Sequence, residues 1–324
     1  MFLVVLYHST VFWTGNWFTK DPIFSSATLG ALSGWLNSFH IYAFALVSGY
    51  LFYHLKCQKG KYEKFIPFVV NKVKRLLIPY VFVSVLWVIP IQGYFFHYNV
   101  KNIFYNYILA VSPGQLWFLV MLFDVFVLFW PFSDFFRQHG WLGAIVVLSM
   151  YGVGFLGSLF ATNVFMIWTA LRYMPFFWLG FKLCQHGSRC VRKIPAVLWF
   201  IASILTNAFA QYLDGLDTNF FKLLKIFFSF ASCVIGAIMA FVVLQKLADV
   251  IKWDTKVFKF FSERSMGVYL LHQQIIFVCI YWLNGLVHPY LHVAINFIVS
   301  TVVSLSISTA LMRFRITRFL IGEK

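Results

Sequence analysis

The chain has 324 residues, of which 61% are hydrophobic and only 11% are charged, and its formal net charge is +16. Soluble domains carry closer to one quarter charged residues, so lipid must be the solvent for most of this chain. Its basic residues stand between apolar runs and no nucleic-acid-binding motif accompanies them, so we expect a protein of the lipid bilayer with no nucleic-acid partner.

Apolar runs long enough to cross a bilayer recur along the whole chain. A transmembrane helix needs about 20 apolar residues. We therefore predict an all-α fold, a polytopic membrane helix bundle of about ten transmembrane helices that forms a single domain over 1–324. The predicted spans are 1–13, 36–55, 77–96, 115–132, 141–160, 168–183, 195–213, 223–245, 266–284 and 290–312. Between the third and fourth spans, 98–112 is predicted to be a loop with a short interfacial helix.

The first predicted span is too short to cross the bilayer. From Met1 to Trp13 a helix extends only about 18 Å, whereas the hydrocarbon core is about 30 Å thick. Either this is a half-helix, or the natural chain starts about ten residues upstream of Met1; of the two we expect a truncated N-terminal helix.

Lysine and arginine residues concentrate in alternate loops, which predicts the orientation in the membrane. The basic loops are 56–75, 182–193 and 246–264, the last of which includes Lys252, and the C-terminal tail, which ends at Lys324. The opposite loops hold little beyond Lys20, Lys101 and Lys222. All basic loops then fall on one side, so both termini are predicted to be cytoplasmic in a multi-pass protein of the plasma (inner) membrane.

Ionisable side chains inside spans are costly in lipid, so each one is a functional candidate. The candidates are His8, His40, Asp124, Arg172 and His272. His8 could act as a general base, because imidazole titrates near neutral pH, or it could be a buried neutral histidine bonded to a carbonyl. Arg172 and Asp124 could pair structurally, or they could line a polar cavity for an acceptor or an acyl thioester.

Two further clusters allow both a structural and a functional interpretation. Lys72, Lys74 and Arg75 stand just before the third span. They could anchor the helix on the cytoplasmic side, or they could bind phosphates, because the arginine fork matches phosphate oxygens. Gly49, with Ser48 beside it at the end of the second span, is expected to allow close helix packing.

Several familiar kinds of site are excluded. The chain has no Gly-rich phosphate loop, no HExxH and no GxSxG motif, which argues against an ATPase, a zinc protease and a classical serine hydrolase. Its five cysteines form no CxxC pair and show no metal-ligand spacing. We therefore expect no metal site and no bound cofactor.

Several short segments, taken together and in order, resemble the membrane acyltransferase 3 family, whose members move acyl groups, usually acetyl from acetyl-CoA, onto sugar hydroxyls of cell-surface glycans. The segments are VVLYH at 4–8, FALVSGYL at 44–51, KRLLIPY at 74–80, QLWFL at 115–119, YMPFFWLG at 173–180 and SMGVYLLH at 265–272. The resemblance implies that His8 is the essential histidine. The arginine that the family carries upstream of this histidine would fall before Met1.

The expected function is therefore that of an integral membrane O-acyltransferase, which moves an acyl group, expected to be acetyl, from acyl-CoA to a hydroxyl of a cell-surface polysaccharide or other glycan. Acetyl-CoA would arrive at the cytoplasmic face, where Lys72, Lys74 and Arg75 could meet its phosphates. His8 would act as base on the acceptor hydroxyl, or it would carry the acyl group transiently.

Supporting roles fall to the other ionisable residues of the spans. Arg172 and His272 would stabilise the oxyanion or orient the acceptor, and Asp124 and His40 are further candidates for catalytic support or acceptor binding. Two other functions remain open. A transporter of polysaccharide or lipid-linked glycan would also need a polar cavity in an apolar bundle, although no inverted repeat is visible. A non-catalytic member of a glycan assembly complex is the other alternative.

Overall fold

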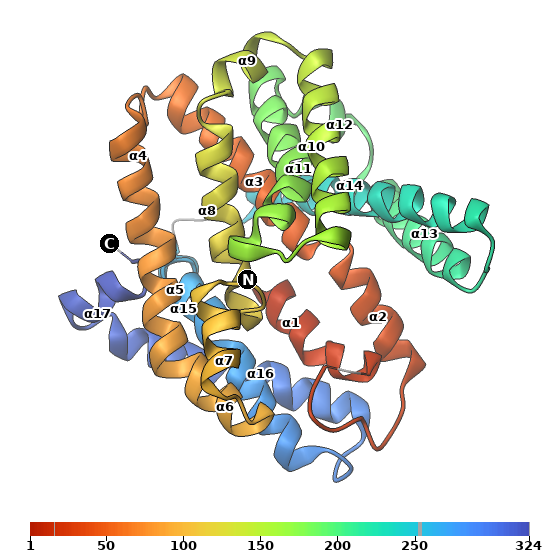
Figure 1. Cartoon of the computed structure of the whole chain (residues 1–324), viewed down its shortest axis with the longest axis vertical. Helices are drawn as coiled ribbons and strands as arrows, with labels where there is room; N and C mark the ends of the chain where they lie inside the picture. Colours follow the sequence, from red (N-terminus) through yellow and green to blue (C-terminus); the bar gives the residue numbers. More distant parts are fainter. Residues whose placement is uncertain (16, 252–254, 324) are drawn as a thin grey trace.

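The computed structural model describes residues 1–15, 17–251 and 255–323, and every regular element in this part of the chain is helical (Figure 1). Lys252 and Lys324, which we counted among the basic residues of the cytoplasmic side, lie outside the described residues. The all-α fold predicted from the sequence is therefore confirmed.

Seven helices of the described ranges are long and apolar enough to cross a membrane. Six of them are α10 (Trp141–Phe160), α11 (Ile167–His186), α13 (Ala196–Asp214), α14 (Asn219–Val250), α15 (Lys256–Leu283) and α16 (Pro289–Leu311). The seventh runs from Phe65 to Phe96 and contains α4 (Phe65–Lys72), α5 (Ile78–Val83) and α6 (Ile89–Phe96).

Shorter apolar helices occupy the remaining predicted spans. They are α1 (Phe2–Thr10), which continues as a 3₁₀ turn over Val11–Thr14, α3 (His40–Tyr53) and α8 (Trp117–Phe129). The expected short helix between the third and fourth spans is also present, as α7 (Val100–Ile103) with a π-helical turn to Ile108. Each predicted span thus coincides with a helix, while the number of helices that cross the bilayer stays a prediction.

The helix Phe65–Phe96 corrects our expectation that 56–75 is a loop, because its first turns lie inside that range. Pro79 lies inside this helix, which continues through it. A proline removes a backbone donor and clashes with the carbonyl four residues earlier. The π-helical segment Val73–Leu77 lies directly before this position and widens the backbone there.

Two other boundaries differ from the prediction. A separate helix, α2 (Ala27–Asn37), precedes α3, and the side chain of Ser26 caps it by accepting a hydrogen bond from Leu29 N. Its glycines and serines made this segment too polar to be predicted as a span. The helix α15 begins at Lys256, well before the predicted start at 266, because Thr255 caps it.

Contacts in loops and near helix ends join segments that the charge pattern placed on the same side. On the predicted cytoplasmic side, Arg264 Nε donates to Thr309 Oγ1 at 2.8 Å. On the opposite side, the side chain of Asn284 accepts from Ile23 N at 3.1 Å and donates to Asp21 O at 3.0 Å. These contacts agree with the predicted sides of the segments that they join, while the alternation of the spans and the side that faces the cytoplasm stay predictions.

The helices α3 and α11 pack with their backbones in contact, as the glycine near the end of the second predicted span suggested. A Cβ atom on Gly49 would lie 1.9 Å from Phe177 O, and one on Gly180 would lie 1.8 Å from Leu46 O. This close approach stacks the rings of Tyr42 and Tyr173, whose centroids are 4.6 Å apart. The pair forms one wall of the cavity described next.

Candidate functional site

Two histidines from opposite ends of the chain meet inside the bundle. His272 Nε2 lies 2.8 Å from His8 Nδ1, and their ring centroids are 4.9 Å apart. His8 stands on α1, which packs against α15 and α16 and buries its Val4 and Val5 side chains. His272 stands in the middle of α15 and is fully buried. The fold thus joins two residues that the sequence analysis had selected separately.

Hydrogen-bond partners assign the protons in this pair. His272 Nδ1 lies 2.8 Å from Tyr269 O and 3.0 Å from Val268 O. Carbonyl oxygens only accept, so His272 Nδ1 carries the proton and His272 Nε2 presents a lone pair. His8 Nδ1 must then be the donor between the two rings. In neutral His8 this leaves Nε2 with a free lone pair, which is the state that a general base requires.

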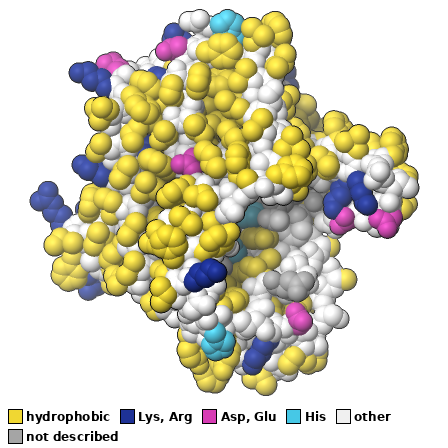
Figure 2. Space-filling view, in the orientation of Figure 1, with side chains coloured by type: hydrophobic (Ala, Val, Ile, Leu, Met, Phe, Trp, Pro, Cys, Tyr) yellow, Lys and Arg dark blue, Asp and Glu magenta, His cyan; other side chains and the backbone are white. Residues whose placement is uncertain are grey.

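His8 lines a cavity of about 280 Å³ among α1, α2, α3, α8, α11 and α15. His40 lines the same cavity, and its Nδ1 lies 2.8 Å from Leu36 O, so its Nε2 is also unprotonated when the ring is neutral. The other lining residues are Tyr7, Trp17, Asn37, Ile41, Tyr42, Gly114, Gln115, Trp117, Tyr173, Tyr269 and Gln273. Figure 2 shows histidine side chains recessed in a hollow beside α1. Polar and aromatic groups thus surround the histidines.

Hydrogen bonds from two other helices hold the part of α15 around His272 in place. Gln115, just before α8, donates to Leu270 O at 3.1 Å and to Gln274 Oε1 at 2.7 Å, and Gln274 donates back at 3.1 Å. Tyr269 OH donates to Gln115 O. Trp87 Nε1 donates to Leu271 O at 3.1 Å. The sequence analysis did not select these residues, because their partners are far away along the chain.

Two of the predicted site residues, Arg172 and Asp124, are not among the described residues that line this cavity. The guanidinium of Arg172, on α11, faces α10, where it lies 6.0 Å from the centroid of the Phe155 ring. Asp124, on α8, has a buried Oδ2 that makes no hydrogen bond to any described residue. Within the described ranges no ion pair joins Arg172 to Asp124. Neither residue lines the histidine cavity.

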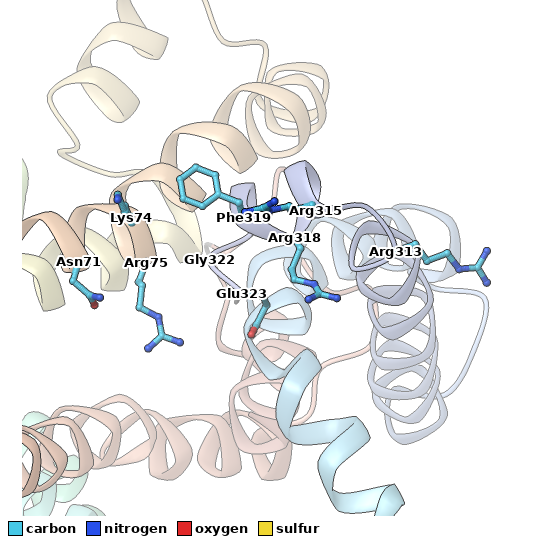
Figure 3. Close-up of a pocket in the computed structure, with 9 residues that line it drawn as sticks. All are labelled: Asn71, Lys74, Arg75, Arg313, Arg315, Arg318, Phe319, Gly322 and Glu323. Carbon is cyan, nitrogen blue, oxygen red and sulfur yellow. The ribbon is translucent and has the colours of Figure 1, made fainter.

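A second cavity, of about 540 Å³, is strongly basic and lies on the predicted cytoplasmic side. Lys74 and Arg75, at the junction of α4 and α5, face arginines of the C-terminal tail across it (Figure 3). Its described lining residues are Asn71, Lys74, Arg75, Arg313, Arg315, Arg318, Phe319, Gly322 and Glu323. The tail arginines were visible in the sequence, but we interpreted them only as signals of orientation.

Glu323 is the single acidic group among the described lining residues of this basic cleft. Burial raises the pKa of its carboxyl, while Arg75 acts in the opposite direction and Glu263 adds to the increase. The tail is held here because Gly322, with φ of +79°, packs against Arg75 O and Pro79. The short helix α17 (Arg315–Leu320) precedes this turn.

Lys72 is separated from the other two members of its predicted phosphate-binding group. Its Nζ lies over the ring of Phe126, 3.6 Å from the centroid, and it also faces the rings of Tyr62 and Phe68. The helix therefore directs Lys72 into an aromatic cage, while Lys74 and Arg75 face the basic cleft.

No group of His, Cys, Asp and Glu side chains in the described part of the chain has the arrangement of a metal site. All five cysteines are free thiols. The side chains that line the histidine cavity supply imidazole, amide, phenol and indole groups.

Comparison with known proteins gives one finding that agrees with this geometry. The family model of the acyltransferase 3 family, described as an acyltransferase domain, matches residues 1–313. No curated protein and no solved structure matches the chain. The matched range contains both histidines of the pair, all the lining residues of their cavity, and Lys74 and Arg75 of the basic cleft. The chain therefore belongs to the membrane acyltransferase 3 family.

Proposed function

We propose that this membrane acyltransferase uses acyl-CoA as donor and transfers an acyl group, acetyl in the simplest case, to a hydroxyl of a cell-surface polysaccharide or another glycan. The observation that carries the proposal is the hydrogen-bonded pair of His8 and His272. His8 keeps a lone pair on Nε2 and lines a polar cavity inside an apolar bundle. A polar cavity with an unprotonated imidazole is what acyl transfer to an alcohol requires.

In the proposed reaction His8 is the catalytic residue. Its Nε2 takes the proton of the acceptor hydroxyl as the oxygen attacks the thioester carbonyl. The bond between the acyl carbon and sulfur breaks, the new ester bond forms, and the CoA thiolate leaves. The thiolate then takes the proton from the His8 imidazolium, which restores the neutral ring. General-base assistance of this kind contributes roughly 10²–10⁴-fold in rate.

His272 is a positioning residue in this scheme. Its Nε2 accepts from His8 Nδ1, so it fixes the ring orientation and stabilises the positive charge that His8 acquires during the reaction. The two backbone carbonyls at its Nδ1 hold it in the accepting tautomer. The bonds from Gln115 and Trp87 to the backbone of α15 keep this arrangement rigid before substrate arrives.

The basic cleft is the proposed seat of the CoA phosphates. Lys74, Arg75 and the tail arginines supply ammonium and guanidinium donors on the side where a cytoplasmic donor would arrive. The helix α15 runs from the side of this cleft towards the histidine cavity, whose wall includes its residues Tyr269 and Gln273. Glu263, which acts electrostatically on Glu323 in the cleft, stands nine residues before His272, a rise of about 14 Å along the helix. The pantetheine arm of the donor would follow this direction.

The test is acyl transfer in membranes that contain the full chain. Acetyl-CoA labelled in its acetyl group is added, and label in the glycan fraction is measured for the wild type, for His8→Ala and for His288→Ala. His288 is the control because it lies outside the cavity, stacked on Tyr290. We expect His8→Ala to lose transfer and His288→Ala to keep it. Equal transfer by all three chains at equal protein levels would refute the mechanism.

A further inference from the structure

A separate polar cavity of about 220 Å³ lies where the α13–α14 hairpin meets α2. This hairpin projects from the rest of the bundle (Figure 1). The described residues that line the cavity are Gly34, Asn37, Ser38, Tyr42, Asn207, Ala210, Gln211, Asp214, Lys225, Ser229, Ser232 and Cys233. Most of these side chains carry amide, hydroxyl, carboxylate or ammonium groups, on helices that are otherwise apolar.

The spacing of these residues shows that whole helix faces point into the cavity. On α13, Asn207, Gln211 and Asp214 follow one another at intervals of four and three residues. On α14, the lining residues from Lys225 to Ser232 have the same spacing. Residues at these intervals lie on one face of a helix. Two polar stripes thus converge on the same space.

Polar side chains between membrane helices often only join the helices to each other. Here Asn207, which is half-buried, and Gln211, which is exposed, line the cavity with their amide side chains. Ser232, which is 1% exposed, has an Oγ without a hydrogen-bond partner among the described residues. An unpaired buried hydroxyl costs free energy and amides are costly beside lipid, so the arrangement of these groups around one cavity indicates that a polar ligand completes them.

The polar cavity adjoins the histidine cavity. Asn37, the last residue of α2, and Tyr42 of α3 line both of them. Asp214 and Lys225 form an ion pair at the end of the hairpin, on the side of the loops predicted to face outward. A ligand bound between α13 and α14 would therefore have one end at Asn37 and Tyr42, next to the cavity of His8. Its other end would lie at the ion pair of Asp214 and Lys225.

We propose that this cavity binds the polyhydroxylated acceptor, one sugar ring at a time, and presents a hydroxyl past Asn37 and Tyr42 to His8. The assignment rests on the proposed function. Pockets for drug-sized ligands measure roughly 300–1,000 Å³, so this smaller cavity suits a group the size of a single sugar ring. Amide side chains donate and accept at once, which matches ligands with several neighbouring hydroxyls.

The test uses membranes with the full chain, acetyl-labelled acetyl-CoA and the endogenous glycan as acceptor. Asn207→Leu and Gln211→Leu remove the amides with little change in side-chain volume. Thr206→Val is the matched control, because Thr206 neighbours Asn207 on α13 but bonds its own helix, to Ala202 O at 2.7 Å, and does not line the cavity. Label in the glycan is measured, together with the dissociation constant of acetyl-CoA and the melting temperature of each purified variant.

We expect each Leu variant to incorporate at least about tenfold less label into the glycan, the effect of leaving a polar partner unpaired. Acetyl-CoA binding and the melting temperature should stay at wild-type values, as should every property of Thr206→Val. Undiminished glycan labelling in both Leu variants would overturn the assignment, as would loss of acetyl-CoA binding in parallel with transfer. Wild-type membranes that label no glycan would instead refute the proposed function, a different outcome in the same experiment.

Discussion

His272 offers the sharpest test of how the site works, because it contacts the proposed base without reaching the acceptor. Replacing it with alanine removes the group that accepts from His8 Nδ1 at 2.8 Å. A hydrogen bond to a charged group contributes about 1.5–3 kcal/mol. The bond to His8 is at full strength only when His8 becomes an imidazolium, so its loss should lower kcat by roughly 10- to 150-fold.

The assay is acetyl transfer by the full chain at saturating acetyl-CoA, with protein levels measured in the same membranes. The KM for acetyl-CoA should not change, because the basic cleft is built from other elements. His272→Gln supplies an oxygen near the position of Nε2 and should recover a substantial part of kcat. A purely structural role for His272 would give no such recovery. Wild-type kcat in His272→Ala would refute the reasoning outright.

Three further predictions follow from other parts of the molecule. Gly49→Ala places a Cβ 1.9 Å from Phe177 O, so it should lower the free energy of unfolding by about 1–3 kcal/mol, measured by thermal unfolding. Gly152→Ala is the control, because no atom lies within 4 Å of its new Cβ, and it should leave the free energy of unfolding unchanged. Arg75→Gln should raise the KM for acetyl-CoA about tenfold with little change in kcat, and added salt should weaken wild-type binding in the same direction. Burial raises the pKa of the Glu323 carboxyl, so protonation as the pH falls removes a negative charge from the cleft and should lower this KM. Glu323→Gln should have a low KM for acetyl-CoA that does not change with pH over this range. If KM in this variant varied with pH as it does in the wild type, Glu323 would not be the titrating group.

The sequence predicted where ten of the helices lie, because each predicted span is a predominantly apolar run. It misplaced the start of the third span because the lysines and the arginine of 56–75 indicated a basic loop. The π-helical segment that lets the backbone pass Pro79 has no sequence pattern that we could have used. The separate helix α2 was missed for a related reason, since its glycines and serines lower the hydropathy while tertiary contacts keep it helical.

The sequence predicted which histidines belong to the site, but it did not predict how they are arranged in space. His8, His40 and His272 were selected because imidazoles are costly in lipid, and the fold brings them to one place. Their partnership could not be read from the chain, because 264 positions separate His8 from His272. Arg172 was selected by the same cost argument, yet it faces α10, since position along a span does not fix the direction of a side chain.

The central claim is that His8 Nε2 acts as the base for acyl transfer from a CoA thioester. The most direct measurement is release of CoA from acetyl-CoA by the purified full chain, in the presence of its glycan acceptor, for the wild type and for His8→Ala. The account predicts that His8→Ala binds acetyl-CoA with wild-type affinity but releases CoA about 10²–10⁴-fold more slowly. Equal rates of release from the two proteins would contradict it.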